Sequence, residues 1–386
     1  MEAYICLILI VIMDFTLEHL MVSNTFSKTK TLIDLKTDKF LKWFFKWRII
    51  SIIGLVFVST FKSYTVGLDT LNYLDYFEKL KNNHDYLFVK PISSKYEISY
   101  TFLNSILAIC GANYRILLLI ISTFVSICIV KFINYISEDK QMSMILYITL
   151  GVFAQSLSAN RQIIAMGLVL LALNLIFDKK IKQSIVIIIF ASTFHISALC
   201  CLILVPIRYL KPKLWIVCTM FCIAIIGSLI FPYIMKVVEK LTPLDYYSRY
   251  FVNNTEYIVK SDIINILYSV GLLFVFIVFY FMRRYLILNE KKLNYYDFSL
   301  MIFLFVPLIR LAGFILNAQA LFNRLSMYFF MVLIVLIPLF LEGLKYNKKI
   351  YMSSTLMVYV ISFGYMYYLY AVKLSCGVVP YFIPVN

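Results

Sequence analysis

Long apolar runs separated by short polar connectors make up most of the chain. A helix needs about 20 apolar residues to cross the hydrocarbon core of a bilayer, and many of the runs approach that length. The pattern therefore predicts an all-α polytopic integral membrane protein. The runs lie at about 4–13, 49–64, 98–112, 115–134, 142–159, 161–177, 184–207, 214–235, 263–282, 298–316, 325–341 and 350–372.

The charges of the connectors predict the orientation of these runs. Residues 23–48 carry seven basic side chains against two acidic ones, which is typical of a cytoplasmic segment. The connector at 65–97 has balanced charge, and we expect it to be external. The same alternation makes residues 236–262 a second external loop.

Two runs do not fit simple alternation. If 98–112 crossed the membrane fully, Lys131 and Lys140 would lie outside, and a full crossing by 184–207 would place the following basic cluster outside. We therefore predict about ten full spans and two re-entrant or partial segments. Re-entrant backbone is tolerated where it is buried in protein or lines a wet cavity, so a polar cavity is expected. No internal repeat or soluble domain stands out, and residues 1–386 are predicted to form a single membrane domain.

Composition narrows the class of protein further. The chain is 62% apolar and 15% charged, whereas soluble domains run at about 45–50% and about 25%. These values exclude a soluble globular enzyme and a disordered chain, and they make the lipid bilayer a partner. The formal net charge of +16 lies in the connectors. No basic stripe with stacking aromatics lies outside the apolar runs, so no nucleic-acid partner is predicted.

Cysteine spacing and short motifs indicate neither a metal nor a cofactor. The eight cysteines lie mostly in apolar runs, without a CxxC pair or an accompanying histidine cluster. Cys218 and Cys222 share a helix face, and packing explains small apolar residues at both positions. The sequence has no glycine-rich phosphate loop, nucleophile elbow, HExxH or DxD motif.

Three arginines near or inside apolar runs are candidate anion ligands: Arg161, Arg310 and Arg324. Charged groups within a membrane are costly, so each one is a functional candidate. Guanidinium binds phosphate in a bidentate manner, and three such groups at one leaflet would suit a diphosphate. Snorkelling at the interface or structural pairing is the alternative interpretation for each.

His195 and Asp69 are the candidate catalytic residues. His195 lies in the middle of the run 184–207, beside Phe194 and Ser197. Imidazole titrates near neutral pH and is suited to general base catalysis, although a lone histidine is often a hydrogen-bonded core residue. Asp69 follows a predicted span closely, where a solvated turn aspartate is the alternative interpretation.

Five fragments follow one another over about residues 65–330. They are Gly67-Leu68-Asp69-Thr70 with Tyr73, Glu97 before a short apolar run, Arg161-Gln162-Ile163-Ile164-Ala165, Phe194-His195-Ile196-Ser197-Ala198-Leu199, and Arg324 four residues before Tyr328. In this order they resemble the EpsG-like branch of the Wzy-type polymerases of surface polysaccharide. One departure is that the family often has Glu-Pro-Gly where this chain has Glu97-Ile98-Ser99.

The resemblance implies a polymerase at the outer face of the bacterial cytoplasmic membrane, in exopolysaccharide, capsule or O-antigen synthesis. Such proteins transfer a glycan from one polyprenyl diphosphate to the non-reducing end of another lipid-linked repeat unit, and other membrane proteins of polysaccharide assembly are expected partners. The arginines would bind the diphosphate without a metal, and His195 or Asp69 would act on the acceptor hydroxyl. We assign Tyr73, Glu97 and Tyr328 to glycan binding.

Two other functions stay open on the sequence. A flippase for lipid-linked oligosaccharides would also have interrupted segments and polar groups near the midplane. A membrane acyltransferase acting on sugars would use His195 as its base. Nor does the sequence separate a polymerase from a ligase that transfers finished chains.

Overall fold

The computed structural model describes residues 1–24, 40, 44–46, 48–82, 96–241 and 263–383. Within these ranges every regular element is helical, which agrees with the predicted fold class. The chain divides into two compact units, Met1–Leu202 with Met352–Asn386 (unit 1) and Ile203–Tyr351 (unit 2). Most of the predicted cytoplasmic segment 23–48 and of the predicted external loop 236–262 lies outside the described residues, and the single membrane domain stays a prediction.

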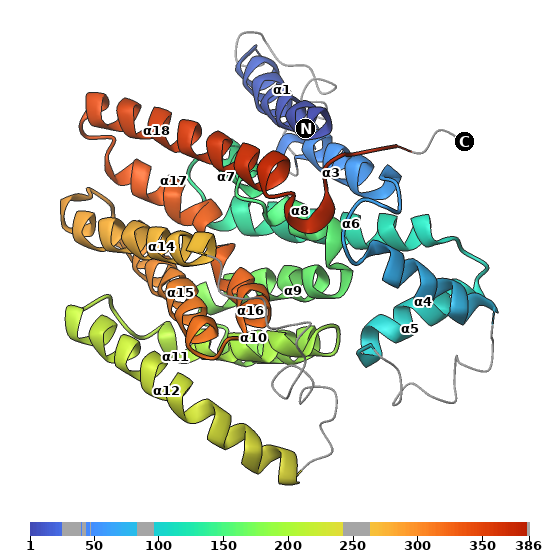
Figure 1. Ribbon diagram of the computed structural model, residues 1–386. Helices are drawn as coiled ribbons and strands as arrows, with labels where there is room; N and C mark the ends of the chain where they lie inside the picture. Colours follow the sequence, from blue (N-terminus) through green and yellow to red (C-terminus); the bar gives the residue numbers. More distant parts are fainter. Residues whose placement is uncertain (25–39, 41–43, 47, 83–95, 242–262, 384–386) are drawn as a thin grey trace. The chain divides into compact units, whose positions relative to one another are not determined.

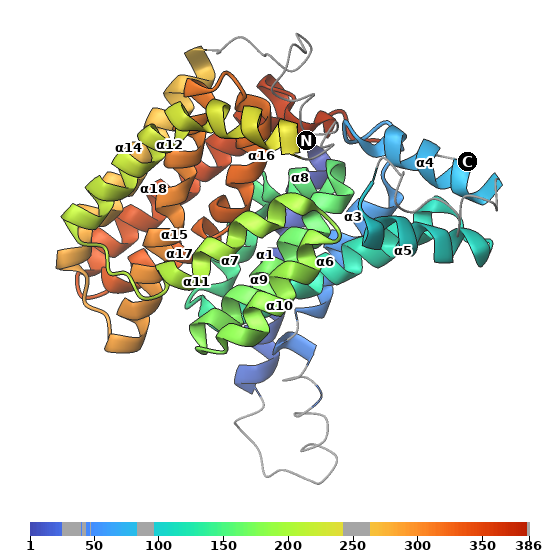
Figure 2. The ribbon, with the colours of Figure 1, turned by 90° about the horizontal axis from the view of Figure 1, so that it is seen from below.

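Unit 1 contains a row of helices in which each one packs against the next, namely α1, α3, α6, α9 and α10 (Figures 1 and 2). Side-chain caps define two helix starts: Asn113 accepts a hydrogen bond from Ile116 N at 3.2 Å, and Asp139 accepts one from Met142 N at 2.9 Å. The helices are α1 (Glu2–Asn24), α3 (Ile49–Phe61), α4 (Thr70–Asn82), α5 (Ile98–Ile109), α6 (Tyr114–Ile136), α7 (Lys140–Thr149), α8 (Val152–Ser158), α9 (Asn160–Phe177), α10 (Ile181–Ser192), η2 (Ile196–Ile203), α18 (Lys348–Tyr367), η4 (Tyr368–Val372) and η5 (Ser375–Gly377).

Unit 2 is organised around α15, which packs against α12, α14, α16 and α17. The tightest approach is at Gly313, where an added Cβ would lie 2.5 Å from Cβ of Phe322 in α16. A larger residue would force the two helices apart, so this glycine permits their contact. The helices are α11 (Leu204–Ile207), α12 (Leu214–Leu241), α14 (Ile263–Met282), η3 (Arg283–Tyr285), α15 (Glu290–Ile315), α16 (Gln319–Phe330) and α17 (Leu333–Gly343).

Among the described residues, six helices are long and apolar enough to cross a membrane, or seven if the bent pair α16 and α17 counts as one span. The expected number of about ten is therefore not confirmed. The reason is helix length: α3 has 13 residues, and at 1.5 Å per residue it extends about 20 Å, against a hydrocarbon core of about 30 Å.

The predicted span at 142–159 is broken in the middle. Gly151 adopts φ 81°, a left-handed conformation that ends the helical path between α7 and α8. The run is thus two short helices, of 10 and 7 residues. Hydropathy does not detect such a break, because both halves are apolar.

The two predicted partial segments are short or broken helices in the structure. Helix α5 has 12 residues and is followed by Gly111 in the left-handed region. The run at 184–207 divides into α10 and η2, and His195 lies at the division. The connector at 65–97, in contrast, contains an element that the sequence analysis did not predict, the amphipathic helix α4.

Candidate functional site

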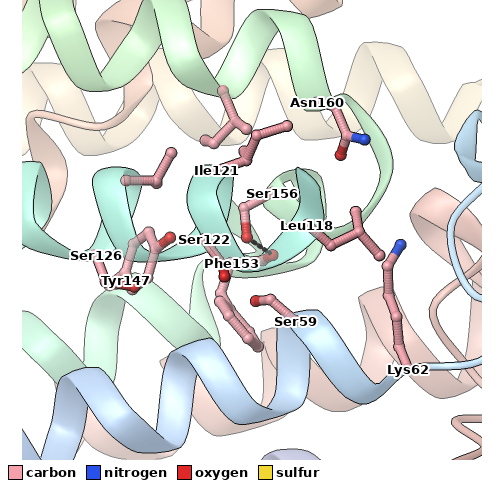
Figure 3. A pocket seen from close by; sticks show the side chains of 12 residues that line it. Ser59, Lys62, Leu118, Ile121, Ser122, Ser126, Tyr147, Phe153, Ser156 and Asn160 are labelled. Atoms are coloured by element: carbon pink, nitrogen blue, oxygen red, sulfur yellow. Dashed lines mark hydrogen bonds between the residues drawn. The ribbon is translucent and has the colours of Figure 1, made fainter. Parts of the chain in front are cut away.

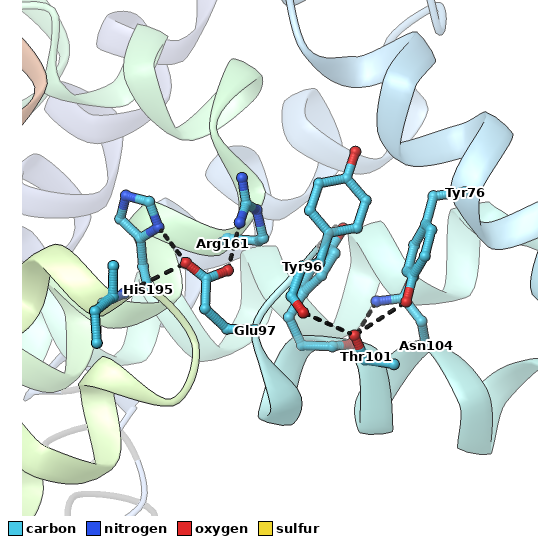
Figure 4. Close-up of polar contacts among 9 residues, drawn as sticks. Tyr76, Tyr96, Glu97, Thr101, Asn104, Arg161 and His195 are labelled. Carbon is cyan, nitrogen blue, oxygen red and sulfur yellow. Dashed lines mark hydrogen bonds and ion pairs between the residues drawn. The ribbon is translucent and has the colours of Figure 1, made fainter. Parts of the chain in front are cut away.

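One carboxylate in unit 1, that of Glu97, contacts two other sequence-selected residues (Figure 4). Glu97 forms an ion pair with Arg161 through one oxygen, and its other oxygen lies 3.0 Å from Nδ1 of His195. The backbone N–H of Ile196 also points to that second oxygen, at 3.4 Å. The three side chains are 18%, 13% and 22% exposed, so the cluster is largely buried yet reachable. We refer to Glu97, Arg161 and His195 as the carboxylate cluster.

The backbone around Glu97 holds this residue against the break before η2. Glu97 is the extended residue that precedes α5. Two residues later, Ser99 N donates to the carbonyl of Thr193 at 3.0 Å, and the two hydroxyls lie 2.7 Å apart. The start of α5 is therefore attached to the end of α10, and this attachment places the carboxylate beside His195.

The ionisation of Glu97 determines the tautomer of His195. Burial alone would raise the pKa of Glu97, but the hydrogen bond from His195 and the charge of Arg161 outweigh burial and lower it to about 2. An ionised carboxylate only accepts hydrogen bonds, so Nδ1 of His195 carries the proton that it shares with Glu97. In the neutral ring, Nε2 is then the nitrogen that accepts a proton, and Figure 4 shows it turned away from Glu97.

Aromatic rings surround the Arg161 guanidinium. Its central carbon lies 4.5 Å from the ring centre of Tyr96 and 5.9 Å from that of Tyr73. Such contacts stabilise a partly buried cation. Tyr73 is 4% exposed, and in this arrangement it contacts Arg161 directly, which the assignment to glycan binding did not anticipate. The Nε–H of Arg161 is buried without a hydrogen-bond partner among the described residues, so the guanidinium keeps donor capacity for an anion.

Asp69 lies in a turn that is attached to the start of the helix carrying Arg161. Its backbone N–H donates to the Ser158 hydroxyl at 3.4 Å, three residues before Arg161. Gly67 begins the turn at φ 97°, and a Cβ there would lie 2.4 Å from the carbonyl oxygen of Leu157. Only glycine allows this approach. Asp69 and Tyr73 are also linked, since the carbonyl of Asp69 accepts from Tyr73 N at 3.1 Å.

Lys62 anchors this turn and was not predicted from the sequence. It is 1% exposed, and its ammonium donates to Val66 O at 2.8 Å, to Thr70 Oγ1 at 2.7 Å and to Leu157 O. Three acceptors satisfy the three N–H groups of a charged lysine. A lysine at the end of an apolar run, just before Gly67-Leu68-Asp69-Thr70, was the available signal.

Lys62 also borders a cavity of about 350 Å³ in unit 1 (Figure 3). The cavity lies among α3, α6, α7, α8 and α9, and hydroxyls line it together with Asn160, which directly precedes Arg161. Polar cavities of this kind hold water in membrane and soluble proteins alike. None of the residues that line this cavity belongs to the segments 98–112 and 184–207, so the polar cavity expected beside those two segments stays a prediction. The hydroxyls belong to Ser59, Ser122, Ser126, Tyr147 and Ser156.

The other selected residues belong to unit 2. Arg310 is half-buried, with its guanidinium carbon 4.5 Å from the ring centre of Tyr268. Arg324 is exposed, and Tyr328 is 2% exposed. The convergence of all three arginines on one diphosphate stays a prediction. Within the described ranges, no group of three or more His, Cys, Asp or Glu side chains is arranged to hold a metal ion.

The model of one protein family, described as the EpsG family, matches residues 45–383. The match covers most of the chain, confirms the resemblance noted from the sequence fragments, and includes the whole carboxylate cluster. No curated protein and no solved structure matches the chain.

Proposed function

The chain belongs to the EpsG family, and on that premise we propose that it polymerises lipid-linked oligosaccharide repeat units at a membrane. The family supports a membrane polysaccharide polymerase, and the apolar helices support a multi-pass protein. The proposed donor is an oligosaccharide on polyprenyl diphosphate, and the proposed location is the bacterial cytoplasmic membrane. The proposed reaction is glycosyl transfer without a metal.

The carboxylate cluster is the observation that carries this proposal. It places an imidazole with a fixed tautomer and a guanidinium on the two oxygens of one carboxylate. Glycosyl transfer from a diphosphate needs a group that removes the acceptor proton and a cation that stabilises the departing diphosphate. His195 and Arg161 have these two properties, and Glu97 orients both.

The proposed step is a displacement at the anomeric carbon of the donor sugar. The acceptor hydroxyl loses its proton to Nε2 of His195 as its oxygen bonds to the anomeric carbon. The bond from that carbon to the diphosphate oxygen breaks, and the electron pair leaves with the diphosphate. The positive charge of Arg161 stabilises the negative charge that develops there. Glu97 stabilises the imidazolium formed on His195.

The remaining selected residues have supporting roles in the proposal. Asp69 is proposed to contact the hydroxyls of the acceptor sugar, and the attachment of its turn beside the start of α9 supports this role. Arg310 and Arg324 are proposed to contact the donor diphosphate, and Tyr328 the glycan. Other polysaccharide-assembly membrane proteins are the proposed partners.

The first test uses the native host. Deletion of the gene, followed by sizing of lipid-linked glycans, should leave single repeat units on lipid. Full-length chains still on lipid would indicate a ligase. Single units confined to the inner leaflet would indicate a flippase, and polymer of normal length lacking acyl groups would indicate an acyltransferase. Each of these three results would contradict the proposed polymerase.

The second test uses the purified full-length protein in liposomes with a lipid-linked repeat unit as donor and acceptor. We expect products that lengthen by whole repeat units. Glu97→Gln and His195→Gln should lower turnover, whereas His19→Gln, at an exposed histidine of α1, is the matched control and should not. Equal activity of all three variants would contradict a role for the cluster.

A further inference from the structure

Unit 2 contains a cavity of its own, with about 680 Å³ of empty space among α12, α14, α15 and α16. Most of its wall is apolar, including Phe221, Leu273, Leu311 and Phe314. Arg310 of α15 brings a permanent positive charge to this wall. The ring of Tyr268 in α14 lies against its guanidinium, with its centre 4.5 Å from the guanidinium carbon. The cavity is thus amphiphilic, with one cationic position in apolar surroundings.

Gln319 is a second, independent indication of a ligand. It lines the cavity, it is 7% exposed, and its Oε1 is buried without a hydrogen-bond partner among the described residues. A buried amide oxygen without a partner is costly, so such a group suggests a bound molecule. A primary amide can present its oxygen to a donor or, turned over, its NH₂ to an acceptor. Asn265 and Asn323 add further amides to the same lining.

Local structure explains why Gln319 faces this cavity. The chain turns sharply after α15, with Asn317 at φ 50° and Ala318 N donating to Gly313 O at 2.9 Å. Because Gly313 also allows Phe322 to approach α15, the first turn of α16 lies close against the end of α15. Gln319 is the first residue of that turn.

We propose that this cavity binds the phosphate end of an isoprenoid lipid, with the first part of the apolar chain against its walls. Arg310 would pair with the phosphate, Gln319 would donate its NH₂ to a phosphate oxygen, and the apolar side chains would cover the isoprene units. The isoprenoid nature of the lipid rests on the proposed function. The positive charge of Arg310 and the apolar walls favour a lipid phosphate independently of that function. Gln319 as a phosphate ligand, and the cavity walls as the place of the lipid chain, are additions to the proposed function.

The test measures binding of a radiolabelled isoprenoid monophosphate to the full-length protein in detergent micelles. Competitors are the isoprenoid alcohol of the same length, phosphatidylglycerol and inorganic phosphate. Arg310→Gln should weaken binding of the phosphate by about tenfold or more, and Gln319→Leu by several-fold. Arg284→Gln is the matched control, because Arg284 is an exposed arginine of unit 2 that also stacks on a tyrosine, at 4.7 Å. Binding of the isoprenoid monophosphate by Arg284→Gln should equal that by the wild type.

Three results would overturn the inference. Unchanged binding by Arg310→Gln and Gln319→Leu would place the lipid elsewhere. Equal competition by phosphatidylglycerol would make the cavity a site for bilayer phospholipid. Equal competition by inorganic phosphate would mean that the apolar walls contribute nothing. Weak competition by the alcohol and by both other competitors supports the inference.

A second measurement covers the case in which a variant fails to fold. A diazirine on the isoprenoid chain should label wild-type peptides from 265–273 and 307–323, and labelling confined to other peptides would overturn the inference.

Polymer formation is measured on the same preparations. Normal polymerisation with unchanged lipid binding by the variants would refute the cavity and leave the function intact. Specific binding at the cavity without any polymerisation would refute the function and leave the cavity intact.

Discussion

Nδ1 of His195 lies 3.0 Å from Oε1 of Glu97, although the two residues are 98 positions apart in the chain. The carboxylate is on the residue before α5, and the imidazole is on the backbone that separates α10 from η2. The same carboxylate pairs with Arg161 at the start of α9. Three irregular points of the chain therefore meet at one acidic side chain, and most of the predictions below concern that meeting point.

Replacement of His195 should affect turnover more than replacement of Asp69. If His195 removes the acceptor proton, His195→Gln should lower kcat by about 10²–10⁴-fold. Asp69→Asn should mainly raise the KM for the acceptor, because its proposed contact is with acceptor hydroxyls. Both values come from the liposome assay with lipid-linked repeat units. A His195→Gln variant of normal turnover beside an inactive Asp69→Asn would reverse the two roles.

The pH dependence of stability should report the ion pair of Glu97. The pKa of this carboxyl is about 2 in the folded protein, below its ordinary value of 4.5. The lowered pKa stabilises the folded state fully above about pH 4.5, and the contribution disappears as the pH falls toward 2. The difference in unfolding temperature between the wild type and Glu97→Gln should not shrink between pH 8 and 5, and it should shrink below pH 4.5. A difference that shrinks already between pH 7 and 5 would contradict the assigned pKa.

Arg161 should not be replaceable by lysine. The guanidinium pairs with Glu97, stacks on Tyr96 and keeps a further N–H, and a lysine ammonium lacks this planar set of donors. We expect Arg161→Lys to recover little of the activity that Arg161→Ala loses, at unchanged protein level in the membrane. Arg284→Lys, at an exposed site, should behave as the wild type. Full activity of Arg161→Lys would show that charge alone is sufficient.

Lys62→Met should destabilise unit 1 and weaken acceptor binding. Methionine is of similar length but removes the ammonium that donates to Val66 O, Thr70 Oγ1 and Leu157 O. Among the described residues, the two carbonyls keep only the Thr70 hydroxyl as a donor, and that hydroxyl loses the donor that it accepts from. An unsatisfied buried polar group costs about 1–3 kcal/mol, and we expect a loss of that size. Unfolding in denaturant measures it. Lys79→Met, at an exposed helical ion pair, should cost less than about 0.5 kcal/mol, and equal costs for both would contradict an anchoring role for Lys62.

Membrane orientation is testable with single cysteines in a variant without the eight native ones. The connector charges predict labelling by an impermeant reagent from outside at Lys81 and Asn254, but not at Lys36 or Asn289. Lys81 is in α4 and Asn289 caps α15, so both probes are on described elements, whereas Lys36 and Asn254 are outside them. Permeabilised cells provide the control, in which all four positions should react. Labelling at Lys36 in intact cells would invert the orientation.

The order of residues along the chain was sufficient to predict helices in a membrane. Apolar composition over many residues makes burial in lipid favourable whatever the helix packing is, so the fold class follows from local properties. The polar interruption around His195 and the short run after Glu97 were visible for the same reason. Arg161 and His195 were also selected individually, since ionisable side chains are conspicuous beside apolar runs, whereas Glu97 was selected through the family resemblance.

The number of spans and the partners of each ionisable residue depended on the tertiary structure. Gly151 breaks an apolar run through its backbone conformation, which mean hydropathy does not register. Glu97 was assigned to glycan, yet it pairs with Arg161 and His195, which are 64 and 98 residues away. Lys62 was overlooked because two of its acceptors are backbone carbonyls, which every residue has. Contacts between distant residues depend on how helices pack, and hydropathy along the chain does not encode that packing.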